Sequence, residues 1–277
     1  MTDVHEAHYT GLCAGGKGRF VFLSATIAVR SEPPAGIFEG QRKDGLDGCV
    51  VSLSYATMEN ALIIGATGGI GQAIAATLRS RGVAVTGLSR ADGLDLTDPD
   101  AVDRVMGAVS GPFDLIFVAT GILALPGAQP EKSLRAVAAA DMVGVFAVNT
   151  IGPALILRHV ARLLRRDGRG VVAALSARVG SIGDNSLGGW YSYRASKAAL
   201  NQIVHGAAIE LGRSHRQSVV VALHPGTVAT PFTAGHAATH PTVAPDVAAA
   251  HLLGVLDGLT PADTGGFYDW AGQVVPW

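Results

Sequence analysis

Tyr193 and Lys197 have the most suggestive spacing for chemistry in this sequence, because they stand four residues apart in a segment with helical character. Residues four apart lie on the same face of a helix. A phenol with an ordinary pKa of about 10 is a weak acid–base group at neutral pH, and an adjacent ammonium stabilises the phenolate and lowers that pKa. We interpret the two residues as catalytic candidates, although the same spacing also occurs on ordinary helix faces.

A glycine-rich loop upstream supports this interpretation. Gly65, Gly69 and Gly71 stand between a short aliphatic run at residues 61–64 and a helical run at residues 72–78. Glycine lets a strand turn sharply into a helix and brings backbone N–H groups close to a pyrophosphate, which the N-terminal end of the helix attracts. The placement predicts dinucleotide binding rather than a purely structural turn.

The end of the next aliphatic run bears on the choice of dinucleotide. Residues 86–90 end in Ser89 and Arg90, and they contain no carboxylate to accept hydrogen bonds from the adenosine ribose of NAD(H). A hydroxyl and a guanidinium suit a 2′-phosphate, so the sequence favours NADP(H). The alternative is a solvated arginine at a strand end.

The elements that must position these residues follow from an alternation of short aliphatic runs and helical segments after Glu59. We expect strands at residues 61–64, 84–88, 115–119, 171–175 and 219–223, and helices at residues 71–81, 99–109, 140–166 and 192–211, the last two open to subdivision. This pattern predicts an α/β fold, a doubly wound parallel sheet of the Rossmann type in one domain over residues 58–277. Residues 1–57 lack a sustained period and are expected to form an irregular extension, poorly ordered or accessory.

Composition excludes several classes of function. The 277 residues include 21 Lys and Arg against 22 Asp and Glu, so the chain lacks the basic field of a nucleic-acid or anionic-membrane binder. The apolar stretch at residues 20–29 is shorter than the roughly 20 residues of a membrane span, and no convincing signal-peptide cleavage site follows it. Cys13 and Cys49 are the only thiols. We expect a cytoplasmic protein with no metal, nucleic-acid or membrane partner.

Together these motifs resemble those of the short-chain dehydrogenase/reductase family, and the resemblance covers nearly all of residues 59–277. Beyond the glycine loop and the Tyr193–Lys197 pair, it rests on Asp95-Leu96 after the position of the family's short third strand, on Asn149 within a long helical run, and on residues 225–230 after a later strand. Residues 176–181, the Gly-Gly-Trp-Tyr before Tyr193 and the ending at residues 275–277 look most like the C-factor or carbonyl-reductase-like branch.

The resemblance implies roles for particular residues. Tyr193 would protonate the carbonyl oxygen, Lys197 would also bind the nicotinamide ribose, and Asn149 would shape its helix and anchor a proton-relay water. Asp95 would meet the adenine, and Val228 and Thr230 would hold the nicotinamide carboxamide. The full set of expected cofactor-binding residues is Gly65, Thr67, Gly68, Gly69, Ile70, Gly71, Ser89, Arg90, Asp95, Leu96, Ala119, Thr120, Gly121, Tyr193, Lys197, Pro225, Gly226, Val228 and Thr230.

Two departures from the family pattern concern the fourth strand and the catalytic serine. Residues 118–121 read Val-Ala-Thr-Gly, where the family usually carries Asn-Asn-Ala-Gly after the strand. Ala177 stands at the usual position of the catalytic serine. Ser176 at the strand end and Ser181 in the following loop are therefore equal candidates.

These observations predict an NADP(H)-dependent oxidoreductase that interconverts a ketone or aldehyde and an alcohol. The alternative is a nucleotide-binding signalling or regulatory protein on the same scaffold, with little or no turnover. The resemblance also implies a homodimer or homotetramer formed through the helical runs at residues 140–166 and 192–211. His236 and His240 lack an evident third ligand, so the segment after Thr230 is expected to form a lid rather than a metal site.

Overall fold

The computed structural model describes residues 4–15, 19–30, 58–233 and 242–277, and the chain divides into two compact units, Met1–Tyr55 and Ala56–Trp277. In the first unit, β1 (Val4–Gly15) and β2 (Arg19–Arg30) pair antiparallel, with Val4 opposite Arg30. This hairpin is regular structure within a segment expected to be irregular. Residues 20–29 are rich in β-branched and aromatic side chains, which favour strands, but they lack the strict alternation that reveals one.

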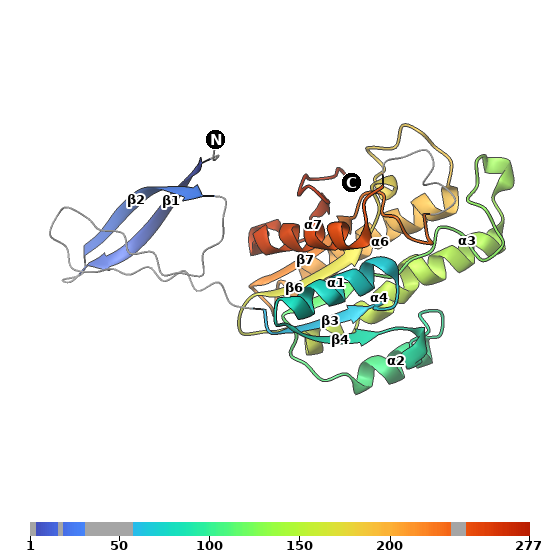
Figure 1. Cartoon of the computed structure of the whole chain (residues 1–277), viewed down its shortest axis with the longest axis horizontal. Coiled ribbons are helices and arrows are strands. Elements are labelled where there is room, and N and C mark those ends of the chain that lie inside the picture. The colour runs from blue at the N-terminus through green and yellow to red at the C-terminus, as the bar shows by residue number, and fades with distance from the viewer. Residues whose placement is uncertain (1–3, 16–18, 31–57, 234–241) are drawn as a thin grey trace. The chain divides into compact units, whose positions relative to one another are not determined.

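A six-stranded parallel sheet forms the centre of the second unit (Figure 1). In the spatial order β4-β3-β5-β6-β7-β8, its strands are β4 (Ala84–Leu88), β3 (Asn60–Ile64), β5 (Leu115–Val118), β6 (Gly170–Leu175), β7 (Ser218–His224) and β8 (Phe267–Asp269). The chain builds outward from β3 to β4 and then crosses back to β5, so the strand order reverses between β3 and β5. In open α/β sheets, such a reversal marks the crevice in which ligands bind.

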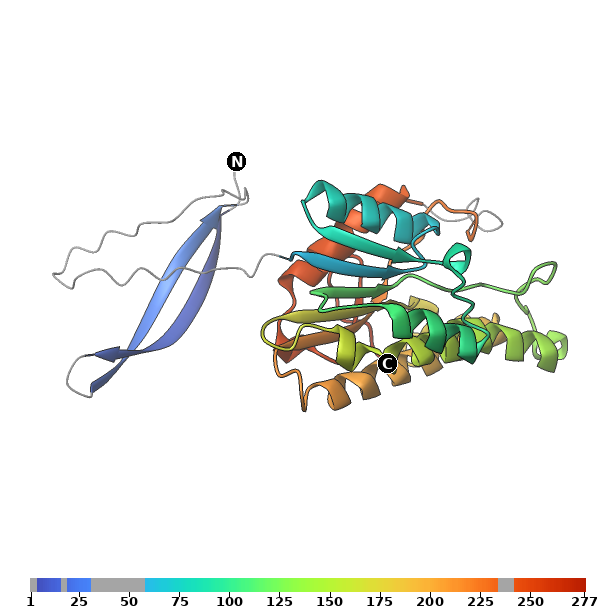
Figure 2. The same ribbon diagram turned by 90° about the horizontal axis from the view of Figure 1, so that it is seen from below.

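Helices cover both faces of this sheet (Figure 2). One face is covered by α1 (Gly69–Ser80) and α7 (Pro245–Gly258), and the other by α2 (Pro99–Ala108), α4 (Gly152–Leu157), α5 (Val160–Leu163) and α6 (Tyr191–Leu211). Successive residues of β3 alternate between the two layers, since Ile63 joins the core beneath α1 and α7 while Leu62 joins the core beneath the other helices. Burial on both faces explains why the strands read as continuous aliphatic runs, and the expected α/β fold is confirmed.

The helical run expected at residues 140–166 is divided in the structure. It consists of α3 (Ala139–Phe146), the π-helical turn η3 (Ala147–Ile151), α4 and α5, and it ends at Leu163. The segment Ala139–Leu157 is long and apolar enough to cross a membrane, but the core helices of soluble proteins also meet this criterion. Here Asn149 and Thr150 in its middle bond to Ser196, so this part of the run packs against α6.

Three features differ from the sequence expectation. The helix α7 and the strand β8 were not expected, and β8, with only 3 residues, is too short to show a strand pattern. The short third strand implied by the resemblance is replaced by a 3-10 turn, η1 (Arg90–Asp92). Further 3-10 turns are η2 (Leu134–Ala136), η4 (Arg178–Gly180) and η6 (Pro261–Asp263).

Candidate active site

The glycine loop after β3 closes against the end of β5. Gly65 has a φ of +86°, in the region that favours glycine, and a Cβ there would lie 2.9 Å from the carbonyl oxygen of Ala119. A Cβ at Gly71 would clash with the carbonyl oxygen of Gly65, so α1 approaches the loop closely only because residue 71 is glycine. The N-cap Gly68 offers no side-chain cap and the first turn has no acidic residue, which leaves the helix N–H groups open to an anion.

Two threonines expected at the cofactor site lie beside this loop. A Cβ at Gly69 would lie 2.7 Å from Cγ2 of Thr230, and a Cβ at Gly65 would lie 3.0 Å from Cγ2 of Thr120. The hydroxyl of Thr120 is buried without a hydrogen-bond partner among the described residues. A close backbone cradle, an uncapped helix start and an unpaired buried hydroxyl fit the pyrophosphate of a dinucleotide.

The structure also gathers most other members of the expected set at this edge of the sheet. Thr67 and Ile70 belong to the glycine loop, Pro225, Gly226 and Val228 follow β7, and Leu96 is buried. A Cβ at Gly121 would lie 3.2 Å from Nζ of Lys197. Asp95 is exposed at the β4 side, where hydrogen bonds from Thr97 lower its pKa.

Tyr193 and Lys197 lie on one buried face of α6, with only 6% and 3% of their surfaces exposed. Nζ of Lys197 donates a hydrogen bond of 2.8 Å to the carbonyl oxygen of Leu175, the last residue of β6. The helix thereby presents both groups at the carboxyl end of the central strands. This is the edge at which ligands bind in parallel sheets.

Burial decides the protonation of this pair. It raises the pKa of Tyr193 above its ordinary value and lowers the pKa of Lys197 to about 7. The expected lowering of the Tyr193 pKa is therefore wrong for this arrangement, because loss of hydration disfavours the phenolate and the ammonium alike. A neutral phenol and an amine that titrates near neutral pH result.

Asn149 connects the helical layer to the loop after β5. It is fully buried in the π turn η3, and its Oδ1 accepts a hydrogen bond of 2.8 Å from the backbone N–H of Ile122. Its Nδ2 donates to the carbonyl oxygen of Ile122 at 2.8 Å and to Oγ of Ser196 at 3.0 Å. One side chain therefore holds the loop and α6 at a set separation.

Both candidate serines have buried hydroxyls that bond to protein groups. Ser176 directly follows β6, and its Oγ donates to Oδ1 of Asn201 at 2.5 Å. Asn201 lies one turn beyond Lys197 on α6, and Lys197 bonds to the residue that precedes Ser176. Ser181 lies after η4, and its Oγ accepts a hydrogen bond of 3.0 Å from the backbone N–H of Asp184.

A carboxylate that sequence reasoning missed holds the start of α6. Glu131, 8% exposed in the loop after β5, accepts hydrogen bonds from the backbone N–H and the hydroxyl of Ser192. Its carbonyl oxygen accepts another from the backbone N–H of Trp190, the N-cap residue, whose φ is 51°. Burial raises the pKa of Glu131, but the bonds from Ser192 outweigh it and leave the pKa below its ordinary value. No sequence spacing links residues 131 and 192.

The end of β4 holds a second carboxylate that the sequence pattern does not indicate. Asp92 turns back through η1, and its Oδ2 accepts hydrogen bonds of 2.8 Å from both the backbone N–H and the hydroxyl of Ser89. Residues 86–90 contain no acidic side chain, as the sequence shows, but the carboxylate of Asp92 reaches this strand end from η1. The Ser89 hydroxyl is already bonded, whereas Arg90 is exposed.

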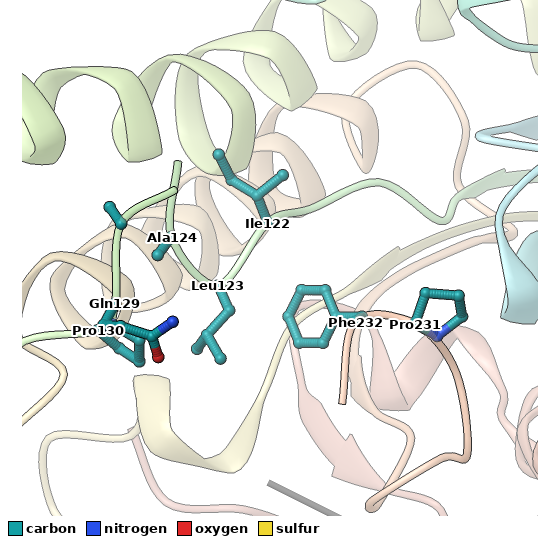
Figure 3. A pocket seen from close by; sticks show the side chains of 8 residues that line it. Ile122, Leu123, Ala124, Gln129, Pro130, Pro231 and Phe232 are labelled. Carbon is teal, nitrogen blue, oxygen red and sulfur yellow. The ribbon is translucent and has the colours of Figure 1, made fainter. Parts of the chain in front are cut away.

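A cavity of about 310 Å³ opens between the loop after β5 and the loop after β7 (Figure 3). Residues 122–124 and 128–130 line it together with Pro231 and Phe232. The ring of Phe232 lies 6.0 Å from that of Tyr193, centroid to centroid, so the cavity adjoins the catalytic candidates. The lid expected after Thr230 thus begins with two cavity residues, while His236 and His240 lie outside the described residues.

Relatives of this chain cover most of its length. The family model for short chain dehydrogenase matches residues 90–240. The 1-hydroxy-2-glutathionyl-2-methyl-3-butene dehydrogenase of Rhodococcus sp. (strain AD45) is 31% identical over 79% of this chain and 100% of its own. C-signal of Myxococcus xanthus is 38% identical over 61% of this chain and 95% of its own. The NADPH-bound carbonyl reductase from chicken fatty liver matches with a TM-score of 0.67 at 25% identity, over 79% of this chain and 99% of that one.

The lowered pKa of Lys197 predicts a pH-dependent stability. Above about pH 7 the buried amine has released a proton that an unfolded lysine, with a pKa of about 10.4, still binds. The free energy of unfolding should therefore rise with pH from about 7 towards 10. Urea denaturation at several pH values measures how the free energy of unfolding changes with pH. Lys197→Met should reduce this slope, whereas the control Lys132→Met, at an exposed lysine, should leave it unchanged. An unchanged slope in Lys197→Met contradicts the prediction.

The contact between Glu131 and α6 predicts a stability loss for Glu131→Gln. The amide presents a donor to the donors of Ser192, so one charge-assisted bond at the helix start is lost. We expect the free energy of unfolding to fall by about 1–3 kcal/mol. Glu210→Gln, at an exposed position of the same helix, should change it by less than about 0.5 kcal/mol. Equal losses in the two variants by urea denaturation would show that the Glu131 contact contributes nothing.

Proposed function

The chain belongs to the short-chain dehydrogenase family and is an oxidoreductase, and from that premise we propose that it interconverts a carbonyl compound and an alcohol with NADP(H). The observation that carries the proposal is the buried pair Tyr193 and Lys197, held on one helix face beside an apolar cavity. A neutral phenol whose ring lies beside a residue of such a cavity is suited to donate a proton to a carbonyl oxygen. The carbonyl-reductase name of a structural relative agrees with this chemistry.

Each side chain has a distinct task in the proposed reduction. When bound, NADPH supplies the hydride that the carbonyl carbon accepts. Tyr193 donates its hydroxyl proton to the carbonyl oxygen, and its raised pKa keeps that proton on the phenol until the oxygen becomes basic. Lys197 stabilises the resulting phenolate when its own amine is protonated, and Asn149 holds the cavity wall at Ile122. A hydroxyl from Ser176 or Ser181 steadies the carbonyl oxygen.

The cofactor would occupy the crevice between β3 and β5. Gly65, Gly69 and Gly71 form the cradle for its pyrophosphate, and the unpaired hydroxyl of Thr120 gains a partner there. At the adenosine end Arg90 would pair with a 2′-phosphate. The hydroxyl of Ser89 is held by Asp92, so Arg90 is the main source of the proposed preference for NADP(H).

Turnover tests the proposed reaction. The full chain should oxidise NADPH in the presence of at least one member of a panel of aldehydes, ketones and quinones. The absorbance of NADPH measures this oxidation. Tyr193→Phe removes the proton donor and should lower kcat at least about a hundredfold, with NADPH binding retained. Wild-type activity in Tyr193→Phe would overturn the assignment of the proton donor.

The alternative is a nucleotide-binding protein that signals without turnover. The relative named C-signal, 38% identical over 168 residues, is the observation that favours it. Tight NADPH binding that survives Tyr193→Phe, combined with no turnover across the whole panel, would support this reading over the enzymatic one.

The exposed guanidinium of Arg90 predicts a preference between cofactors. A charge-assisted bond to the 2′-phosphate contributes about 1.5–3 kcal/mol, or roughly tenfold to a hundredfold in affinity. Fluorescence titration should show NADPH binding more tightly than NADH by this factor, and Arg90→Ala should remove the difference. Arg213→Ala, at an exposed arginine beyond the end of α6, should retain it. Equal affinities in the wild type would reject the NADP(H) assignment.

We propose that the chain assembles as a homodimer or homotetramer through the helices of the α6 side. Val143, Ile151 and Ile209 are 68%, 51% and 56% exposed on α3, η3 and α6, and large apolar side chains on neighbouring helices are suited to a subunit contact. Sedimentation at micromolar concentration should give the mass of two or four chains. Ile209→Glu should shift it towards one chain, and Glu210→Gln should not. A single-chain mass for the wild type would refute the assembly.

A further inference from the structure

The cavity beside Tyr193 has an uncharged lining. Its eight lining residues include no Lys, Arg, Asp or Glu, and Gln129 offers the only polar side chain. Leu123 and the ring of Phe232 face each other across it (Figure 3). At about 310 Å³ it lies at the small end of ligand pockets, which span about 300–1,000 Å³. The space suits a small organic compound rather than a large one.

Two carboxylates adjoin this lining, whereas the neighbouring cations Lys132 and Lys197 do not line it. A narrower cavity shares five of the lining residues and adds Glu131 and Asp141. The hydrogen bonds from Ser192 keep Glu131 in its anionic form. The side chains that line the cavity are thus mainly apolar, and negatively charged carboxylates lie behind them.

Two cationic groups of this region, Lys197 and Arg194, have other partners, and Lys132 is exposed to solvent. Nζ of Lys197 bonds to the carbonyl oxygen of Leu175, and Nε of Arg194 bonds to the carbonyl oxygens of residues 188 and 189. A carboxylate or phosphate entering the cavity would therefore meet no counter-charge among the lining side chains, which is unfavourable wherever it loses hydration.

We propose that the substrate is a small, uncharged and mainly apolar carbonyl compound, and that anionic carbonyl compounds are rejected at this cavity. The inference rests on the proposed function, which directs the carbonyl group towards Tyr193. It adds a charge criterion to that function and identifies Gln129 as the position at which the criterion can be changed.

Equilibrium binding tests the criterion independently of turnover. Three ketones are titrated calorimetrically into the full chain with NADP⁺ present and absent: acetophenone, methyl para-acetylbenzoate and para-acetylbenzoate. The ester and the carboxylate have nearly the same shape, so the ratio of their affinities reports the effect of the negative charge. We expect the ester to bind at least about tenfold more tightly than the carboxylate.

A gain of function at Gln129 completes the test. Gln129→Arg places a cation in the lining and should increase the affinity for para-acetylbenzoate by about tenfold. The affinity for acetophenone should change by less than about threefold. Methionine is similar in length to glutamine and uncharged. Gln129→Met should therefore leave the ratio of the affinities for the ester and the carboxylate at its wild-type value. A circular dichroism melt of each variant confirms that it is folded.

The outcomes separate this inference from the proposed function. Preference for the neutral ketones without NADPH oxidation would support the charge criterion and reject the proposed reaction. Binding or turnover of the carboxylate that equals that of the ester would overturn the criterion and leave the reaction intact. Failure of all three ketones to bind would overturn the criterion as well.

Discussion

The buried amide of Asn149 bonds at once to the loop after β5 and to α6. It lies where the helical run widens into the π turn η3, and both of its polar atoms are satisfied by Ile122 and Ser196. A fully buried amide is strongly destabilising without partners, so the loop and the helix cannot separate without exposing it. The position of the cavity relative to Tyr193 depends on this connection.

The start of α6 depends on a second buried polar group from the same loop. Glu131 caps the helix through Ser192, while the preceding Trp190 adopts a left-handed conformation that places no side-chain cap there. The loop after β5 thus determines both the wall of the cavity and the entry of the helix that bears Tyr193 and Lys197. This packing excludes water from the pair, which raises the pKa of Tyr193 and lowers the pKa of Lys197 to about 7.

The fold was largely predictable, because strands buried on both faces produce continuous aliphatic runs that sequence patterns reveal. All five expected strands occur, and α1, α2 and α6 lie within a few residues of their expected bounds. The prediction failed where the local signal was weak. The strand β8 has 3 residues, and the 3-10 turn η1 replaces a strand because Asp92 folds back onto Ser89.

The sequence by itself determined the parts of the site that rest on short-range geometry. The glycine loop needs residues without a Cβ at fixed spacings, and the pairing of Tyr193 with Lys197 needs only one helical turn. Tertiary structure alone decided what surrounds them. The Nζ of Lys197 bonds to Leu175 rather than to the phenol, and Glu131 reaches Ser192, because elements far apart in the chain exclude water there. Burial and charge of this kind arise only from packing, which spacing along a sequence does not encode.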